Sequence, residues 1–183
     1  MVKSIAQDNT KQQEESIMKI EKTIRIFIGS SINDLELERM KLMSFIQGLN
    51  NKYHERGIFI EGYICEETPN DMRAGGSQKL HDEFITDKAD IAVFMFYTKA
   101  GEFTLKELEL SRETFIEKGR PNIYVFFKTA DDGSFADPAV QNVAARIFDE
   151  YGHYYKLFSD IETVQLDLTQ AIREILPEIA DNV

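Results

Sequence analysis

The chain has 183 residues, a formal net charge of −11 and 43% hydrophobic residues, which suits one domain with a single core. The acidic excess disfavours binding to nucleic acid and to anionic membranes, and no apolar run approaches the ~18 residues of a membrane span. One cysteine and three scattered histidines exclude an internal disulfide and a zinc cluster, so we predict no metal site. The polar N-terminus lacks a signal-peptide pattern, and we expect a cytoplasmic protein.

Strands and helices alternate along most of the chain. Residues 1–22 form a polar N-terminal arm, for which a helix and disorder both stay open. After the arm, apolar β-branched runs alternate with amphipathic stretches. The predicted strands are 23–29, 57–65, 90–97, 122–128 and 153–158. The predicted helices are 33–53, 77–89, 104–119, 138–152 and 159–176. We expect Met40 and Phe115 in the buried stripes of their helices, and a capping box of Ser159 and Glu162 at the start of the last helix.

This alternation predicts a parallel sheet with helices on both faces and right-handed connections. Five strand–helix units favour a flavodoxin-like α/β three-layer sandwich with strand order 2-1-3-4-5, in one domain over residues 23–183. Ligands of such sheets bind beyond the carboxyl ends of the strands, at the switch point between strands 1 and 3. The candidate loops are therefore those after the first three strands, at 29–34, 66–76 and 98–104.

Several enzyme classes that use similar folds are excluded by these loops. A phosphate-accepting receiver domain needs acidic residues where this chain has Gly29-Ser30-Ser31 and Tyr97-Thr98. The dinucleotide motif GxGxxG, the P-loop motif GxxxxGK[ST] and the serine-hydrolase motif GxSxG are all missing.

The first two loops offer groups that could bind an anion. Ser30 and Ser31 precede a helix N-terminus, a favourable place for phosphate, although Ser31 or Asn33 could simply cap that helix. The second loop carries Arg73 before Gly75-Gly76, where paired glycines permit close approach of a ligand or another subunit. A solvated turn is the alternative for this loop.

The third loop leads to Glu107, whose carboxylate has two interpretations. Thr104 and Glu107 fit a capping box, in which Glu107 bonds the Thr104 amide, while Glu109 should point elsewhere into water. A carboxylate beside Phe103 and opposite the first loop would instead suit cleavage of a glycosidic bond. With no second carboxylate paired to it, the leaving group must depart unaided, as the positively charged nicotinamide of NAD does.

The three loops together resemble a known family. IFIGSSINDLELER (26–39) resembles the first motif of bacterial TIR-like domains, roughly [IV]F[IV]SSxxDLxxER. KADIAVFMFY resembles the family's third strand, and GEFTLKEL resembles the motif in which an aromatic residue stands four positions before the catalytic glutamate. The same stretch is similar to the GTxxE pattern of nucleoside deoxyribosyltransferases. The resemblance covers about residues 23–176, with Phe103 in place of the usual Trp and Gly75-Gly76 in place of Pro-Gly.

The resemblance implies a TIR-like NAD glycohydrolase or cyclase that cleaves the nicotinamide–ribose bond in bacterial anti-phage defence signalling. NAD would be a substrate, with no cofactor. Glu107 would be catalytic, and the substrate-binding residues would be Gly29, Ser30, Ser31, Arg73 and Phe103. The resemblance also implies self-association through the 66–76 loop and allows an effector protein as a partner. A base-transfer enzyme of the deoxyribosyltransferase type and a non-catalytic TIR assembly module stay open as alternatives.

Overall fold

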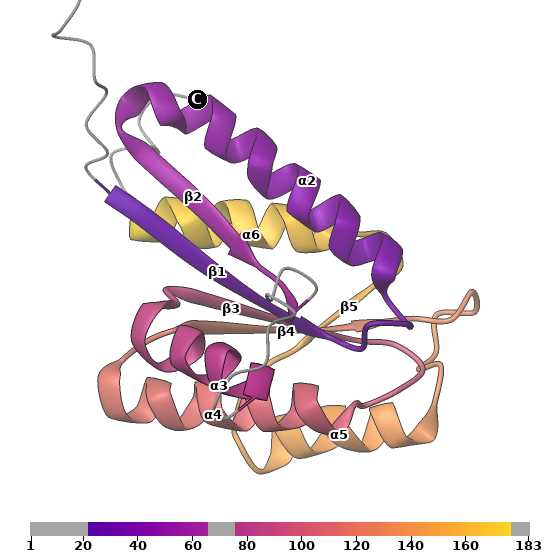
Figure 1. Ribbon diagram of the computed structural model, residues 1–183. Helices are drawn as coiled ribbons and strands as arrows, with labels where there is room; N and C mark the ends of the chain where they lie inside the picture. The colour runs from indigo at the N-terminus through magenta and orange to yellow at the C-terminus, as the bar shows by residue number, and fades with distance from the viewer. Residues whose placement is uncertain (1–21, 66–75, 177–183) are drawn as a thin grey trace, which may run out of the picture.

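The computed structural model describes residues 22–65 and 76–176, and its centre is a five-stranded parallel sheet (Figure 1). The strand order is β2-β1-β3-β4-β5, so the predicted flavodoxin-like topology is confirmed. The strands are β1 (Lys22–Ser30), β2 (Ile58–Tyr63), β3 (Ile91–Phe96), β4 (Asn122–Lys128) and β5 (Lys156–Phe158). The predicted arm falls almost wholly at residues 1–21, outside the described ranges.

Helices cover both faces of the sheet (Figure 1). On one face lie α2 (Glu36–Tyr53), which continues into the short 3₁₀ helix η1 (His54–Arg56), and α6 (Glu162–Ile175). The opposite face carries α3 (Gly76–Glu83), the π-helix η3 (Phe84–Lys88), α4 (Glu102–Lys118) and α5 (Pro138–Asp149). This arrangement is the expected three-layer sandwich.

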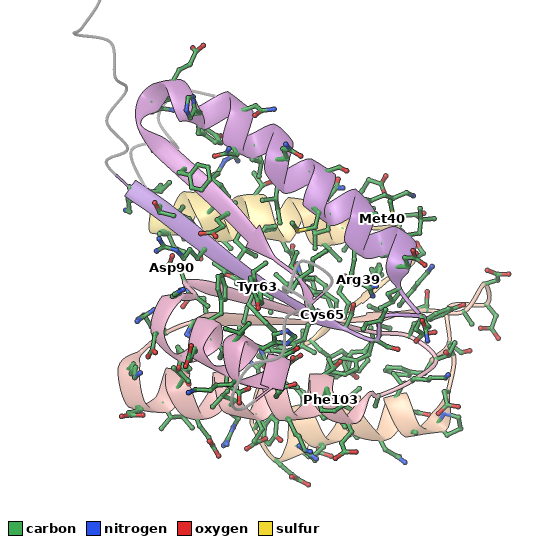
Figure 2. The ribbon with its side chains drawn as sticks, in the orientation of Figure 1. Arg39, Met40, Tyr63, Cys65, Asp90 and Phe103 are labelled. Atoms are coloured by element: carbon green, nitrogen blue, oxygen red, sulfur yellow. The ribbon has the colours of Figure 1, made fainter. Side chains whose placement is uncertain are left out.

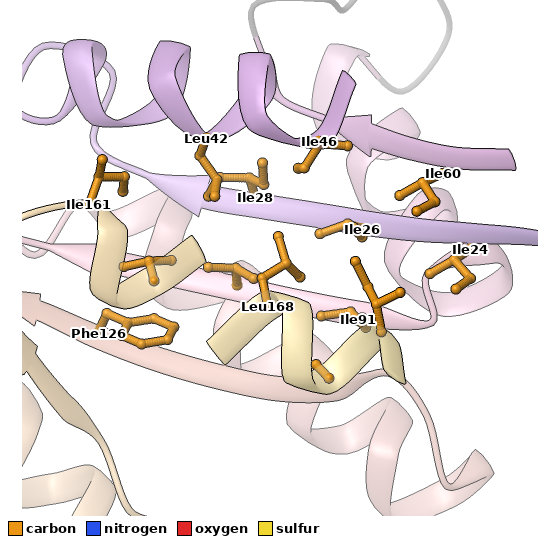
Figure 3. Packing of buried hydrophobic residues seen from close by; sticks show 14 of the residues in the cluster. Ile24, Ile26, Ile28, Leu42, Ile46, Ile60, Ile91, Phe126, Ile161 and Leu168 are labelled. Carbon is orange, nitrogen blue, oxygen red and sulfur yellow. The ribbon is translucent and has the colours of Figure 1, made fainter. Parts of the chain in front are cut away.

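The two central strands carry side chains into two separate cores. Alternate residues of β1 point to opposite faces, because successive side chains of a strand alternate. Ile26 packs toward α2 and α6, as Figure 3 shows, whereas Phe27 packs with the helices of the other face. Every residue of β3 is buried, as expected for an all-apolar strand in the middle of a parallel sheet.

The helix faces differ from the sequence prediction at several positions. Met40 and Phe115, both expected in buried stripes, are 60% and 45% exposed, whereas Arg39 is only 1% exposed. The Ser159/Glu162 capping box is also wrong. Ile161 is the residue before α6, no side chain caps that helix, and the Ser159 hydroxyl donates to Asp160 instead.

None of the helices within residues 22–65 and 76–176 combines the length and hydrophobicity needed to cross a bilayer. In the same ranges, no cluster of three or more His, Cys, Asp or Glu side chains could hold a metal ion.

Candidate functional site

A cavity of about 390 Å³ lies between the end of β1, Cys65 just beyond β2, and the first two turns of α3 and α4. Its volume is within the ~300–1,000 Å³ range of small-molecule pockets. Its position is the switch point between β1 and β3, where the strand order reverses. The polar residues that line it are Ser30, Ser31, Cys65, Ser77, Gln78, His81, Thr104 and Glu107.

The structure brings together all but one of the residues that the sequence suggested for the site. Gly29, Ser30, Ser31, Phe103 and Glu107 line this cavity, although they come from segments far apart in the chain. Arg73 lies outside the described residues. Further lining residues were not foreseen, among them Cys65, Gln78 and His81.

Glu107 does not cap its helix. α4 begins at Glu102, two residues earlier than expected, and Gly101 precedes it in an extended conformation without any side-chain cap. Glu107 therefore lies in the second turn, and its carboxylate bonds side chains of α3 rather than the Thr104 amide. Its side chain is buried, with the residue only 6% exposed, and it faces the cavity.

The carboxylate of Glu107 is instead bound by α3. His81 Nδ1 lies 3.0 Å from Oε1 of Glu107, and both side chains are buried. Gln78 Nε2 approaches the same oxygen at 3.5 Å, a much weaker contact. No local sequence pattern indicates this pairing, because His81 and Glu107 are 26 residues apart.

The buried Arg39 of α2 supports the loop after β1 through hydrogen bonds. Its NH1 donates to the Ser30 hydroxyl at 3.1 Å and to the Ser31 carbonyl at 2.7 Å, and its NH2 donates to the Ile32 carbonyl at 2.6 Å. Figure 2 labels Arg39 on the side of α2 that faces the sheet. Because the Ser30 oxygen accepts from Arg39, its own O–H stays available to donate to another acceptor.

The expected helix cap in this loop is also wrong. Leu35 precedes α2 and no side chain caps the helix, so neither Ser31 nor Asn33 has that role. Asp34 instead accepts from the amides of Thr98 and Lys99, at 2.7 and 3.1 Å, and from the Thr98 hydroxyl. This carboxylate therefore fastens the loop after β1 to the loop after β3, the two sides of the switch point.

Gly29 and Phe103 contribute in different ways to the cavity. A Cβ at Gly29 would lie 2.6 Å from Cε1 of the buried Phe94, so only glycine fits without displacing the core. The Phe103 ring is 64% exposed, and Lys106 Nζ lies 5.7 Å from its centroid. Phe103 thus offers an open aromatic surface beside the cavity, labelled in Figure 2.

Glu109 belongs to a different cluster. Its carboxylate accepts from Arg112 at 3.3 Å and from the Tyr151 hydroxyl at 2.5 Å, and Arg146 also bonds that hydroxyl. Burial, followed by the bond to Glu109, raises the pKa of Tyr151. We expected Glu109 to point into water. It instead links α4 to α5 and Tyr151, away from the cavity.

A smaller cavity of about 220 Å³ lies between α4 and α5. Its lining is largely apolar, with Leu108, Ile123 and Ile147 among its residues, and it includes no carboxylate from the described part of the chain. Of these two cavities, only the one at Glu107 is lined by a carboxylate of the described residues.

Neither the protein-family models nor the curated proteins gave a match to this chain. The functional interpretation therefore depends on the residues of the site and their geometry.

Proposed function

We propose that this chain is a TIR-like NAD glycohydrolase or cyclase, which cleaves the bond between nicotinamide and ribose. The observation that carries the proposal is the buried carboxylate of Glu107, which shares one cavity with Ser30, Ser31 and Phe103. Its sequence motifs resemble those of TIR-like domains over the same residues.

The groups around the cavity suit the two ends of the substrate. The Ser30 hydroxyl and the backbone amides of the loop after β1 would bind phosphate oxygens, together with Arg73. The nicotinamide ribose would lie against Glu107, and the exposed ring of Phe103 would stack on one of the substrate rings.

The chemistry needs one carboxylate. When the bond between C1′ and the nicotinamide nitrogen breaks, both electrons pass to the nitrogen, which loses its positive charge. The leaving group is therefore neutral and needs no acid. Glu107 stabilises the positive charge that develops on the ribose, in a cavity where few waters compete. Water then adds to C1′ and releases a proton to give ADP-ribose, or a nucleophile of the substrate itself adds to give a cyclic product.

The biological setting that we propose is bacterial anti-phage defence, with self-association through the 66–76 loop and an effector protein as a possible second partner. All three elements come from the resemblance to TIR-like domains and are proposals in the same sense as the reaction.

The test compares two glutamates of one helix. Purified protein at high concentration is incubated with NAD, and the products are separated by chromatography. Glu107→Gln should lower nicotinamide release at least ~100-fold, the usual cost of losing one electrostatic stabiliser, without a fall in thermal stability. The matched control, Glu109→Gln, makes the same change outside the cavity and should keep the activity.

Parallel incubations with nucleosides separate the alternatives. Base release from nucleosides without NAD cleavage would indicate the base-transfer reaction. Absence of base release from either substrate, with self-association intact, would indicate an assembly module.

A further inference from the structure

We propose that His81 is a positioning residue for Glu107. By donating from Nδ1 to Oε1, it fixes the carboxylate so that Oε2 is the oxygen presented to a ligand. This role rests on the catalytic role proposed for Glu107.

The hydrogen bonds at Glu107 are unevenly divided between its two oxygens. His81 and Gln78, both on α3, approach Oε1 at 3.0 and 3.5 Å. Among the described residues we find no hydrogen bond to Oε2. Since a carboxylate oxygen facing a cavity gains most from a donor supplied by a ligand, Oε2 is the contact point for a ribose hydroxyl or for a developing positive charge.

The direction of the His81 bond follows from its acceptor. An ionised carboxylate can only accept, so the His81 nitrogen that faces it must carry the proton. We therefore assign the Nδ1–H form to His81, and its imidazole orients Glu107 as a buried donor orients a ligand-binding carboxylate.

Packing holds the imidazole in this orientation. The Tyr63 ring meets the His81 ring edge-on, with centroids 5.7 Å apart. Tyr63 in turn stacks on Phe84 of η3 at 4.2 Å. His81 is only 7% exposed, so ring rotation would have to displace these neighbours. The donor is thus fixed relative to the sheet, and the carboxylate is fixed relative to the donor.

Two substitutions distinguish positioning from simple packing. In His81→Asn, the side-chain amide nitrogen can occupy the place of Nδ1 and still donate to Glu107. His81→Leu fills a similar volume but has no donor. We expect the Asn variant to keep kcat for NAD cleavage within about tenfold of wild type, and the Leu variant to lose about 100-fold in kcat with a much smaller change in KM. Equal kcat values for the folded Leu variant and wild type, or an equal loss in both variants, would overturn the proposal.

A second measurement does not depend on activity. Nitrogen NMR of ¹⁵N-histidine-labelled protein, at a pH where the imidazole is neutral, should assign the Nδ1–H tautomer to His81. The Nε2–H tautomer would show that His81 does not donate to Glu107. If wild-type protein leaves NAD intact, the reaction proposed above fails, whereas the tautomer still decides whether His81 positions the carboxylate.

Discussion

Replacing Arg39 with methionine tests how the loop after β1 is supported. The guanidinium is 1% exposed and donates to three oxygens of consecutive residues, Ser30 to Ile32. Methionine keeps much of the unbranched stem, so the substitution removes the donors while it leaves most of the packing.

The loss of folding stability can be estimated for each of the three acceptor oxygens in turn. The Ser31 carbonyl keeps backbone contacts from Asp34 and Leu35, at 3.3 and 3.4 Å, and the Ser30 hydroxyl borders the cavity, so both lose little. The Ile32 carbonyl loses its 2.6 Å bond, and an orphaned partly buried acceptor costs ~1–3 kcal/mol. We expect the free energy of unfolding to fall by about 2 kcal/mol, which lowers Tm by about 4–8 °C in a chain of this size.

Thermal and urea unfolding of the two proteins measure this difference. Lys41→Met is the matched control, because it removes an exposed cation from the same helix and should change the unfolding free energy by less than ~0.5 kcal/mol. The KM for NAD should rise in the Arg39 variant, since the loop that would bind phosphate is released. An Arg39→Met protein as stable as the control, with unchanged KM, would refute the reasoning.

Two further predictions concern single residues. Burial lowers the pKa of His153 below its ordinary value of 6.5, although a hydrogen bond to the Ile123 backbone opposes this shift. The unfolded chain therefore binds a proton first as the pH falls through 6.5, so stability is lost on acidification, and His153→Gln should reduce that loss in urea unfolding followed against pH. A variant with the wild-type pH slope would contradict this assignment. Cys65, the single cysteine of the chain, lines the proposed NAD cavity and is partly exposed. Alkylation by iodoacetamide should block nicotinamide release, NAD should slow the labelling, and a Cys65→Ser protein should resist the reagent; complete labelling with full activity would argue against this placement.

The fold could be predicted because its signals are local. The all-apolar run at Ile91–Phe96 identified the central strand, and the β4 bounds agree with the prediction. The alternation of strands and helices then limited the topology to few choices, because parallel connections have one hand. That topology also indicated that Glu107 and the Ser30-Ser31 loop would face one cavity, and both line it in the structure.

The parts of the site that were missed depend on contacts between distant residues. His81 has no sequence relation to Glu107 that a periodic pattern could reveal. Arg39 did leave a signal, because it continues the helical spacing of the buried Leu35, Leu42 and Ile46. The prediction followed hydrophobicity and chose Met40, although a charged residue on a buried stripe was the more informative feature.

The burial of Glu107 bears on whether it serves the fold or a ligand. A carboxylate that loses water costs free energy unless strong partners compensate, and its protein partners in the described structure are one imidazole and a distant amide. An apolar side chain could hold α4 against its neighbours at a lower cost in free energy, and the buried Leu108 in the next position is such a side chain. The fold alone therefore gives little reason for a charge at this point. Neutralising Glu107 should leave stability unchanged or higher while activity falls, the pattern expected of a residue that serves a ligand at the expense of the fold.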